Sequence, residues 1–197
     1  MSNEIIKNAF NKGLTFEEFL EKADQQIKST DPAGLDQEAK DLYEYTKLNF
    51  HRMQRVLKAH PVNEETAKKI KAIDTKQKWM VITENWCGDS AQSSPEFFKM
   101  SKLNDNITLR IVERDTYPEV IDLYLTNGKK SIPIVVAFDE NWNQLWKWGA
   151  RPEALQNEMN EWMKLELPSE ELFEKVHIWY SKNKGNELFN EVNSLLK

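Results

Sequence analysis

Cys87 is the only cysteine in this chain of 197 residues, and its neighbours are residue types that shape thiol chemistry. Trp86 precedes it, and Gly88, Asp89 and Ser90 follow it. A thiol becomes a nucleophile where its surroundings favour the thiolate, as the free N–H groups and the dipole at a helix start do. A carboxylate two residues away acts in the opposite direction, because it raises the pKa of the thiol. The pattern predicts a reactive thiol and leaves its ionisation at neutral pH open.

Two elements place Cys87 at a strand-to-helix junction. Residues 78–83 form an apolar run that predicts a buried strand, and residues 90–98 have the pattern of a following helix. The same reasoning predicts the rest of a sheet, with strands at 107–112, 134–138 and 144–148 and a helical run at 120–125. A turn-rich connection between the last two strands indicates a hairpin. Parallel and antiparallel strand pairs are therefore expected in one sheet.

The motif around Cys87 resembles the Trp-Cys-Gly-x-Cys active site of the thioredoxin family, which lies at the same kind of junction. Pro95, eight residues after the cysteine, is similar to the proline that kinks the family's active-site helix. Ile132 and Pro133, just before an apolar strand, resemble the family's cis-proline loop opposite the catalytic cysteine. The resemblance spans about residues 74–165. It implies an α/β, thioredoxin-like fold with a mixed central sheet flanked by helices.

Two departures from the family pattern limit the chemistry that the resemblance implies. Ser90 stands where thioredoxins have a second cysteine, so the chain cannot form their internal disulfide. Val81, six residues before Cys87, stands where many thioredoxins bury a carboxylate. The resemblance then implies monothiol exchange, in which Cys87 attacks a disulfide or mixed disulfide and an external thiol resolves the adduct. It assigns catalysis to Cys87 and Ser90, and substrate binding to Trp86, Gly88, Asp89, Ile132 and Pro133.

Several alternatives stay open at this level. Cys87 is either reactive or a buried structural thiol. Ser90 either merely replaces a cysteine or donates a hydrogen bond to the thiolate. Arg52 and Arg55 share a helix face, which is either solvated or an anion site for a glutathione-like carboxylate if that helix covers the active site. The rival to an enzyme is a redox-inactive thioredoxin fold that serves as a binding or scaffold module. Peroxide reduction is less favoured, because no peroxidase-like motif surrounds Cys87.

Composition restricts the classes of partner. The net charge of −5 and the lack of basic runs argue against nucleic-acid and anionic-membrane partners. The first 15 residues lack an uninterrupted apolar core, so neither a signal peptide nor a membrane span is expected. A single cysteine then favours a reducing cytoplasm. The expected partner is a disulfide-containing protein or a low-molecular-weight thiol such as glutathione, with no resident cofactor. His51, His60 and His177 lack ligand spacing, so no metal site is expected.

The helical patterns divide the chain into three parts. Residues 1–75 are expected to form a helical N-terminal extension, 76–166 the thioredoxin-like domain, and 167–197 a C-terminal helical tail packed on that domain. The predictions within these parts are a capping box from Thr15 to Glu18, a long helix at 36–60, a helix after Asn63, and later helices at 153–164, 169–182 and 187–196.

Overall fold

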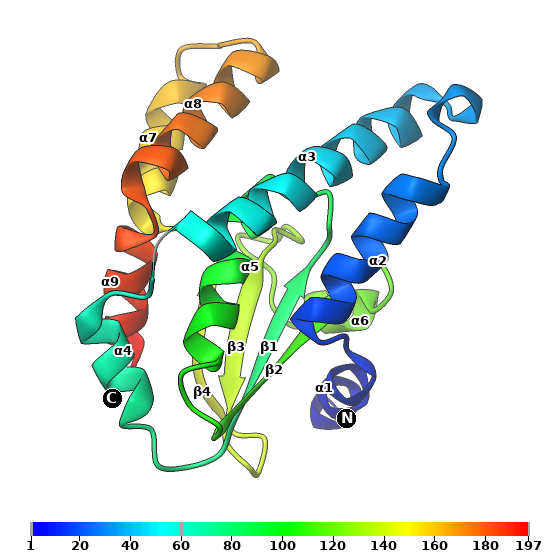
Figure 1. Cartoon of the computed structure of the whole chain (residues 1–197). Coiled ribbons are helices and arrows are strands. Elements are labelled where there is room, and N and C mark those ends of the chain that lie inside the picture. The colour runs from blue at the N-terminus through cyan, green and yellow to red at the C-terminus, as the bar shows by residue number, and fades with distance from the viewer. Residues whose placement is uncertain (1, 60, 197) are drawn as a thin grey trace.

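The structure is a computed structural model that describes residues 2–59 and 61–196, so His60 lies outside the described residues. Among these residues a four-stranded sheet forms the centre of the molecule (Figure 1). Its strands are β1 (Gln77–Thr83), β2 (Ile107–Glu113), β3 (Ile134–Phe138) and β4 (Gln144–Gly149), in the order β2-β1-β3-β4. β1 is parallel to β2 and antiparallel to β3, and β3 and β4 form an antiparallel hairpin. The expected mixed sheet is therefore confirmed.

β1 is buried on both faces, which explains its continuous apolar run. Trp79 and Val81 belong to an apolar cluster that also contains residues of α2 (Phe16–Ser29), α3 (Gln37–Ala59) and α5 (Gly88–Ser101). Met80 and Ile82 belong to a second cluster with α1 (Ser2–Lys12) and α6 (Pro118–Ile121). Alternate residues of a strand point to opposite faces, so β1 connects the two halves of the core.

The remaining helices are α4 (Glu64–Lys71), α7 (Glu153–Met163), α8 (Ser169–Asn183) and α9 (Asn186–Leu195). Of these, α4 and α9 lie beside α5 and β4, and the pair α7–α8 extends away from the sheet (Figure 1). α3 packs along α5, α7 packs on α8, and α9 contacts both α4 and β4. The long helix α3 therefore lies over the helix that begins after Cys87. None of the described helices is long and apolar enough to cross a membrane.

A local signal explains where α2 begins. The capping box of α2 is present, because Thr15 Oγ1 accepts a hydrogen bond from the N–H of Glu18 at 3.1 Å and the Glu18 side chain accepts one from the N–H of Thr15 at 2.7 Å. Helix α6 is shorter than the expected run at 120–125. The N–H groups of Leu123 and Tyr124 donate to the carbonyl oxygens of Val120 and Ile121, three positions earlier, so the α-helical pattern ends.

The N-terminal segment begins with a helix whose bounds the sequence patterns did not define. α1 forms a helix for which no start signal was identified, and its residues Ala9 and Phe10 are buried in the second core cluster. Leu14 then pairs with Ile111 at the free edge of β2, through hydrogen bonds of 2.9 and 2.7 Å. Tertiary burial therefore fixes this helix, which local propensity did not indicate.

Candidate functional site

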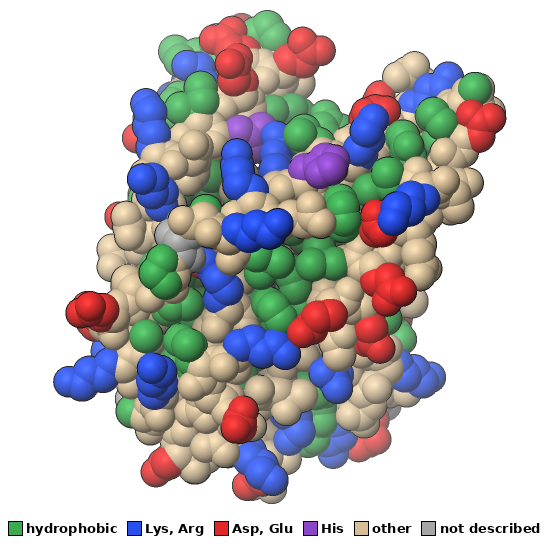
Figure 2. Space-filling model, viewed as in Figure 1, with side chains coloured by type: hydrophobic (Ala, Val, Ile, Leu, Met, Phe, Trp, Pro, Cys, Tyr) green, Lys and Arg blue, Asp and Glu red, His purple; other side chains and the backbone are tan. Residues whose placement is uncertain are grey.

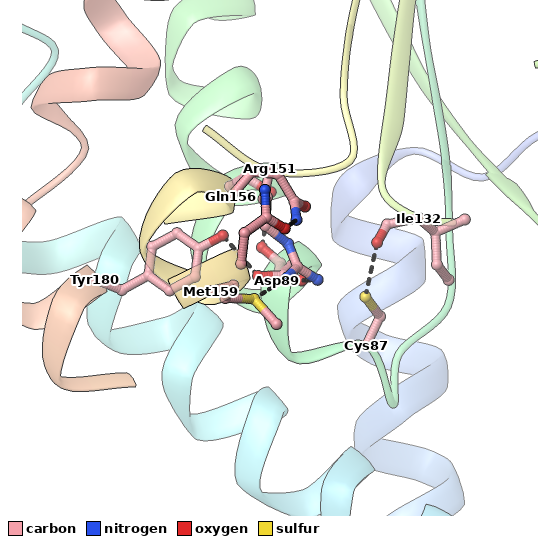
Figure 3. A network of polar contacts seen from close by, with 9 residues as sticks. Cys87, Asp89, Ile132, Arg151, Gln156, Met159 and Tyr180 are labelled. Carbon is pink, nitrogen blue, oxygen red and sulfur yellow. Dashed lines mark hydrogen bonds and ion pairs between the residues drawn. The ribbon is translucent and has the colours of Figure 1, made fainter. Parts of the chain in front are cut away.

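Cys87 is the residue immediately before α5, as the strand-to-helix pattern predicts. The backbone N–H groups of Asp89 and Ser90 are directed at its sulfur. The thiol donates a hydrogen bond to the carbonyl oxygen of Ile132, with 3.5 Å between Sγ and that oxygen (Figure 3). The peptide bond between Ile132 and Pro133 is cis. The expected cis-proline loop therefore lies opposite the cysteine.

The surroundings of Cys87 hold the thiol in its protonated form. Only 8% of Cys87 is exposed, and this burial raises the pKa of the thiol to about 12. The carboxylate of Asp89 also raises the pKa, whereas the N–H groups of Ser90 and Asp89 and the charge of Arg151 lower it by less. The question that the sequence left open is thus answered in favour of the neutral thiol at neutral pH.

Asp89 connects the start of α5 to the C-terminal helices (Figure 3). One of its carboxylate oxygens is 2.6 Å from Nη2 of Arg151, which follows β4, and the other accepts a hydrogen bond of 2.8 Å from the hydroxyl of Tyr180 in α8. Burial raises the pKa of Asp89, and these two donors oppose the rise. Arg151 also contacts the sulfur of Met159 in α7. The C-terminal tail therefore contributes directly to the environment of the thiol.

The hydroxyl group of Ser90 makes its hydrogen bonds with Thr83 and Ser94, and among the described residues none joins it to Cys87. Thr83 donates a hydrogen bond of 2.5 Å to the Ser90 hydroxyl, which is also 2.6 Å from the hydroxyl of Ser94, and only 1% of Ser90 is exposed. Of the two alternatives, the structure thus favours a serine that fills the cysteine position and contacts the thiol through its backbone N–H.

Ser90→Cys is expected to form an internal disulfide with Cys87. Residues 87 and 90 are three apart at a helix start, a spacing that brings side chains within roughly 5–6 Å and inside the range for a disulfide. The reduced variant should be less stable by about 1 kcal/mol, because Thr83 and Ser94 lose a hydrogen-bond partner. The intact mass of the variant, measured after mild oxidation, should be lower by two hydrogen atoms, as disulfide formation requires.

The matched control is Ser93→Cys in the same helix, where the new thiol lies too far along α5 to reach Cys87. That variant should stay reduced as a monomer. A Ser90→Cys chain that also stays reduced would show that residue 90 points away from Cys87, and the comparison with the two-cysteine motif would then fail at this position.

A cavity of about 320 Å³ opens beside the thiol. It lies between α3, the start of α5 and the α7–α8 pair, and Figure 2 shows a hollow in this region, with hydrophobic, basic and histidine side chains around it. Most of the described residues that line it are apolar, two are arginines and one is an aspartate: Leu42, Tyr45, Arg52, Trp86, Cys87, Gly88, Asp89, Arg151, Met159, Phe173, Val176 and His177.

The predicted binding residues divide between this cavity and the opposite side of the thiol. Trp86, Gly88 and Asp89 line the cavity together with Cys87, whereas Ile132 and Pro133 belong to the cis-proline loop. The ring of Trp86 is also covered by the guanidinium of Arg114, whose carbon is 4.8 Å from the ring centre. Arg52 lines the cavity, so α3 covers the site, as the anion-binding alternative required; Arg55 is exposed.

The sequence did not indicate the residues of α7 and α8 that form the site. Tyr180 contacts Asp89 across 91 positions of the chain, and His177, Phe173 and Met159 are similarly remote from Cys87. No spacing pattern could have joined them, because their proximity arises from the packing of whole helices. No group of residues suited to a metal ion occurs among the described residues.

The fold and the junction define a thioredoxin-fold protein with one thiol beside a cis-proline loop. A model of the family described as thioredoxin matches residues 35–164, and the chain therefore belongs to this family. Among curated proteins none matches the sequence.

Two solved structures share the fold over nearly the whole chain. A Pseudomonas aeruginosa protein of unknown function is 17% identical with a TM-score of 0.60, and the match covers 95% of this chain and 93% of that one. An HIV epitope scaffold is 18% identical with a TM-score of 0.58, covering 96% of this chain and 95% of that one. At these identities the likeness concerns the fold.

Proposed function

We propose that the protein carries out thiol–disulfide exchange at Cys87 with small disulfides or mixed disulfides. The observation that carries this proposal is the position of the thiol, which lies at the start of α5, next to the cis-proline loop and in the wall of a cavity. Backbone N–H groups directed at a sulfur stabilise the thiolate as it forms. With one cysteine in the chain, a reducing compartment supplies the second thiol that the reaction needs.

The exchange has two balanced steps. Cys87 loses its proton, and the thiolate attacks one sulfur of a disulfide R–S–S–R; the S–S bond breaks, Cys87 becomes linked to S–R, and the departing RS⁻ takes up a proton. An external thiol then attacks the R sulfur, which releases a new disulfide and restores the Cys87 thiolate. Because the pKa of the Cys87 thiol is about 12, deprotonation of the thiol limits the first step near neutral pH.

The reaction is tested with bis(hydroxyethyl) disulfide, an uncharged probe. Folded protein at alkaline pH should gain one adduct, visible in the intact mass and removed by dithiothreitol, and Cys87→Ser should gain none. An unchanged mass for the folded chain, together with rapid reaction of the urea-unfolded chain, would exclude exchange in the native state.

A second candidate function, non-covalent binding without redox chemistry, is favoured by the raised pKa and the 8% exposure of Cys87. In that case the cavity holds a ligand and the thiol serves only as part of its wall. The two candidates give different results in the same experiment, because a binding protein would give no adduct with the disulfide probe and would still take up a ligand.

A further inference from the structure

The cavity beside Cys87 has an apolar side that is unusual for a solvated surface. Leu42, Tyr45 and Phe173 are exposed by 39%, 41% and 45%, although burial of large apolar side chains usually stabilises the folded state. All three line this cavity with buried Val176, and the rings of Tyr45 and Phe173 meet edge to face at 6.3 Å across it. Exposed apolar side chains from two helices that gather at one hollow mark a binding site for an apolar group.

The same cavity contains the positive charge of Arg52, which no carboxylate of the described residues compensates. Arg52 donates a hydrogen bond to the neutral amide of Asn49 at 3.0 Å, and no carboxylate of the described residues lies within 4 Å of its guanidinium. Burial, followed by the charge of Arg55, lowers the pKa of Arg52 to about 10. Among the described residues that line the cavity, Asp89 alone is a carboxylate, and it already binds Arg151 and Tyr180. Anion binding would therefore offset a desolvated charge.

His177 provides a second polar group at this end of the cavity. Its Cε1 lies 3.5 Å from the position that a Cβ at Gly88 would take, so the ring covers the start of α5 next to Cys87. Its Nδ1 is buried and has no hydrogen-bond partner among the described residues. Burial and the charges of Arg52 and Arg55 lower the pKa of His177 to about 4, so the ring is neutral at pH 7 and can donate one N–H without an added charge.

We propose that this cavity binds a small organic carboxylate with an apolar body, whose acid group is held by Arg52 and His177 and whose body lies against Tyr45 and Phe173. The volume of about 320 Å³ is at the lower end of the range for small-molecule pockets, roughly 300–1,000 Å³, and is too small for a helix of a partner protein. If the bound carboxylate is the substrate that reacts with Cys87, the inference rests on the proposed function. Binding of the carboxylate itself requires no reaction at the thiol.

Binding is measured with the full-length chain at pH 7.4, using the fluorescent probe anilinonaphthalene sulfonate and its displacement by octanoate. Octanoate should displace the probe, and octanol, which has the same apolar chain without the charge, should be at least about tenfold weaker. Arg52→Gln should lower the affinity for octanoate at least about tenfold. Lys58→Gln, which removes an exposed charge from the same helix, should change that affinity less than about twofold.

The apolar side has its own matched pair of variants. Phe173→Ser should lower the affinity for the fluorescent probe several-fold, whereas Ile178→Ser should leave it unchanged. Ile178 is equally exposed, at 45%, on the same helix, but it does not line the cavity. Leu42→Ser on α3 provides a second test if Phe173→Ser alters the thermal midpoint. The proposal would be overturned if octanol displaced the probe as well as octanoate does, or if Arg52→Gln bound octanoate with unchanged affinity. Equal losses of probe affinity in the Phe173→Ser and Ile178→Ser variants would also overturn it.

The outcome separates this inference from the proposed function. Displacement by octanoate without any adduct from the uncharged disulfide supports the carboxylate site and rejects exchange at Cys87. The opposite result is an adduct with the uncharged disulfide while octanoate fails to displace anilinonaphthalene sulfonate. That result supports exchange at Cys87 and rejects the carboxylate site.

Discussion

Asp89→Asn is expected to lower the pKa of Cys87 by about one to two units and to accelerate its alkylation at pH 7 by roughly 3- to 10-fold. Burial is the largest cause of the raised pKa and stays in place, but the second cause, the Asp89 carboxylate, is removed. Arg151 also loses its charged partner at 2.6 Å and then favours the thiolate more strongly.

The magnitude of this acceleration follows from two opposing effects. A fall of one pKa unit gives about ten times more thiolate at a fixed pH well below the pKa, whereas the nucleophilicity of each thiolate falls by about threefold for the same change. The net gain is therefore about threefold per unit.

The measurement is the rate of alkylation by iodoacetamide against pH, followed by intact mass. For the unmodified chain the rate should rise about tenfold per pH unit from pH 7 to 10, since the pKa of about 12 lies above this range. Glu158→Gln, which removes an exposed charge from α7, should reproduce that profile. A plateau near pH 8.5 in the unmodified chain would show that burial does not hold the thiol neutral.

The sequence was sufficient to predict the sheet and the junction because both depend on local patterns. The run from Trp79 to Ile82 is apolar at every position, as a strand covered on both faces requires, and Cys87 follows it at the turn into α5. The pairing of Cys87 with Ile132 and Pro133 came from the family resemblance, since no spacing rule brings residues 45 positions apart together.

The protonation state of the Cys87 thiol could not be predicted, because it depends on the balance of two effects that shift its pKa in opposite directions. The helix start favours the thiolate, and the sequence shows it; burial disfavours the thiolate, and its extent depends on α3 and α8. The cavity has the same origin. Tyr45 lies on α3 and Phe173 on α8, helices that are far apart in the sequence, and only the packing of both helices near the start of α5 makes the two rings neighbours.

Gly149→Ala is expected to destabilise the protein by about 3–5 kcal/mol, a loss at the upper end for single substitutions. Gly149 ends β4 with a φ of +128°, a conformation that residues with a Cβ rarely adopt. A Cβ there would collide with the carbonyl oxygen of Pro133 and would lie 3.1 Å from the Cα of Ile134. The backbone of the cis-proline loop has no room to accommodate this atom without moving.

The free energy of unfolding, measured by urea denaturation, tests this expectation, and Gly34→Ala is the matched control. Gly34 has no atom within 4 Å of the place where its Cβ would lie, so that change should alter stability by less than about 1 kcal/mol. Because Pro133 adjoins the Ile132 carbonyl that accepts the Cys87 hydrogen bond, the displaced loop in Gly149→Ala should also leave the thiol more accessible to iodoacetamide in the folded protein. Gly149→Ala with the stability of the Gly34 control would show that β4 and the loop can separate at little cost, and Gly149 would then have no part in positioning the site.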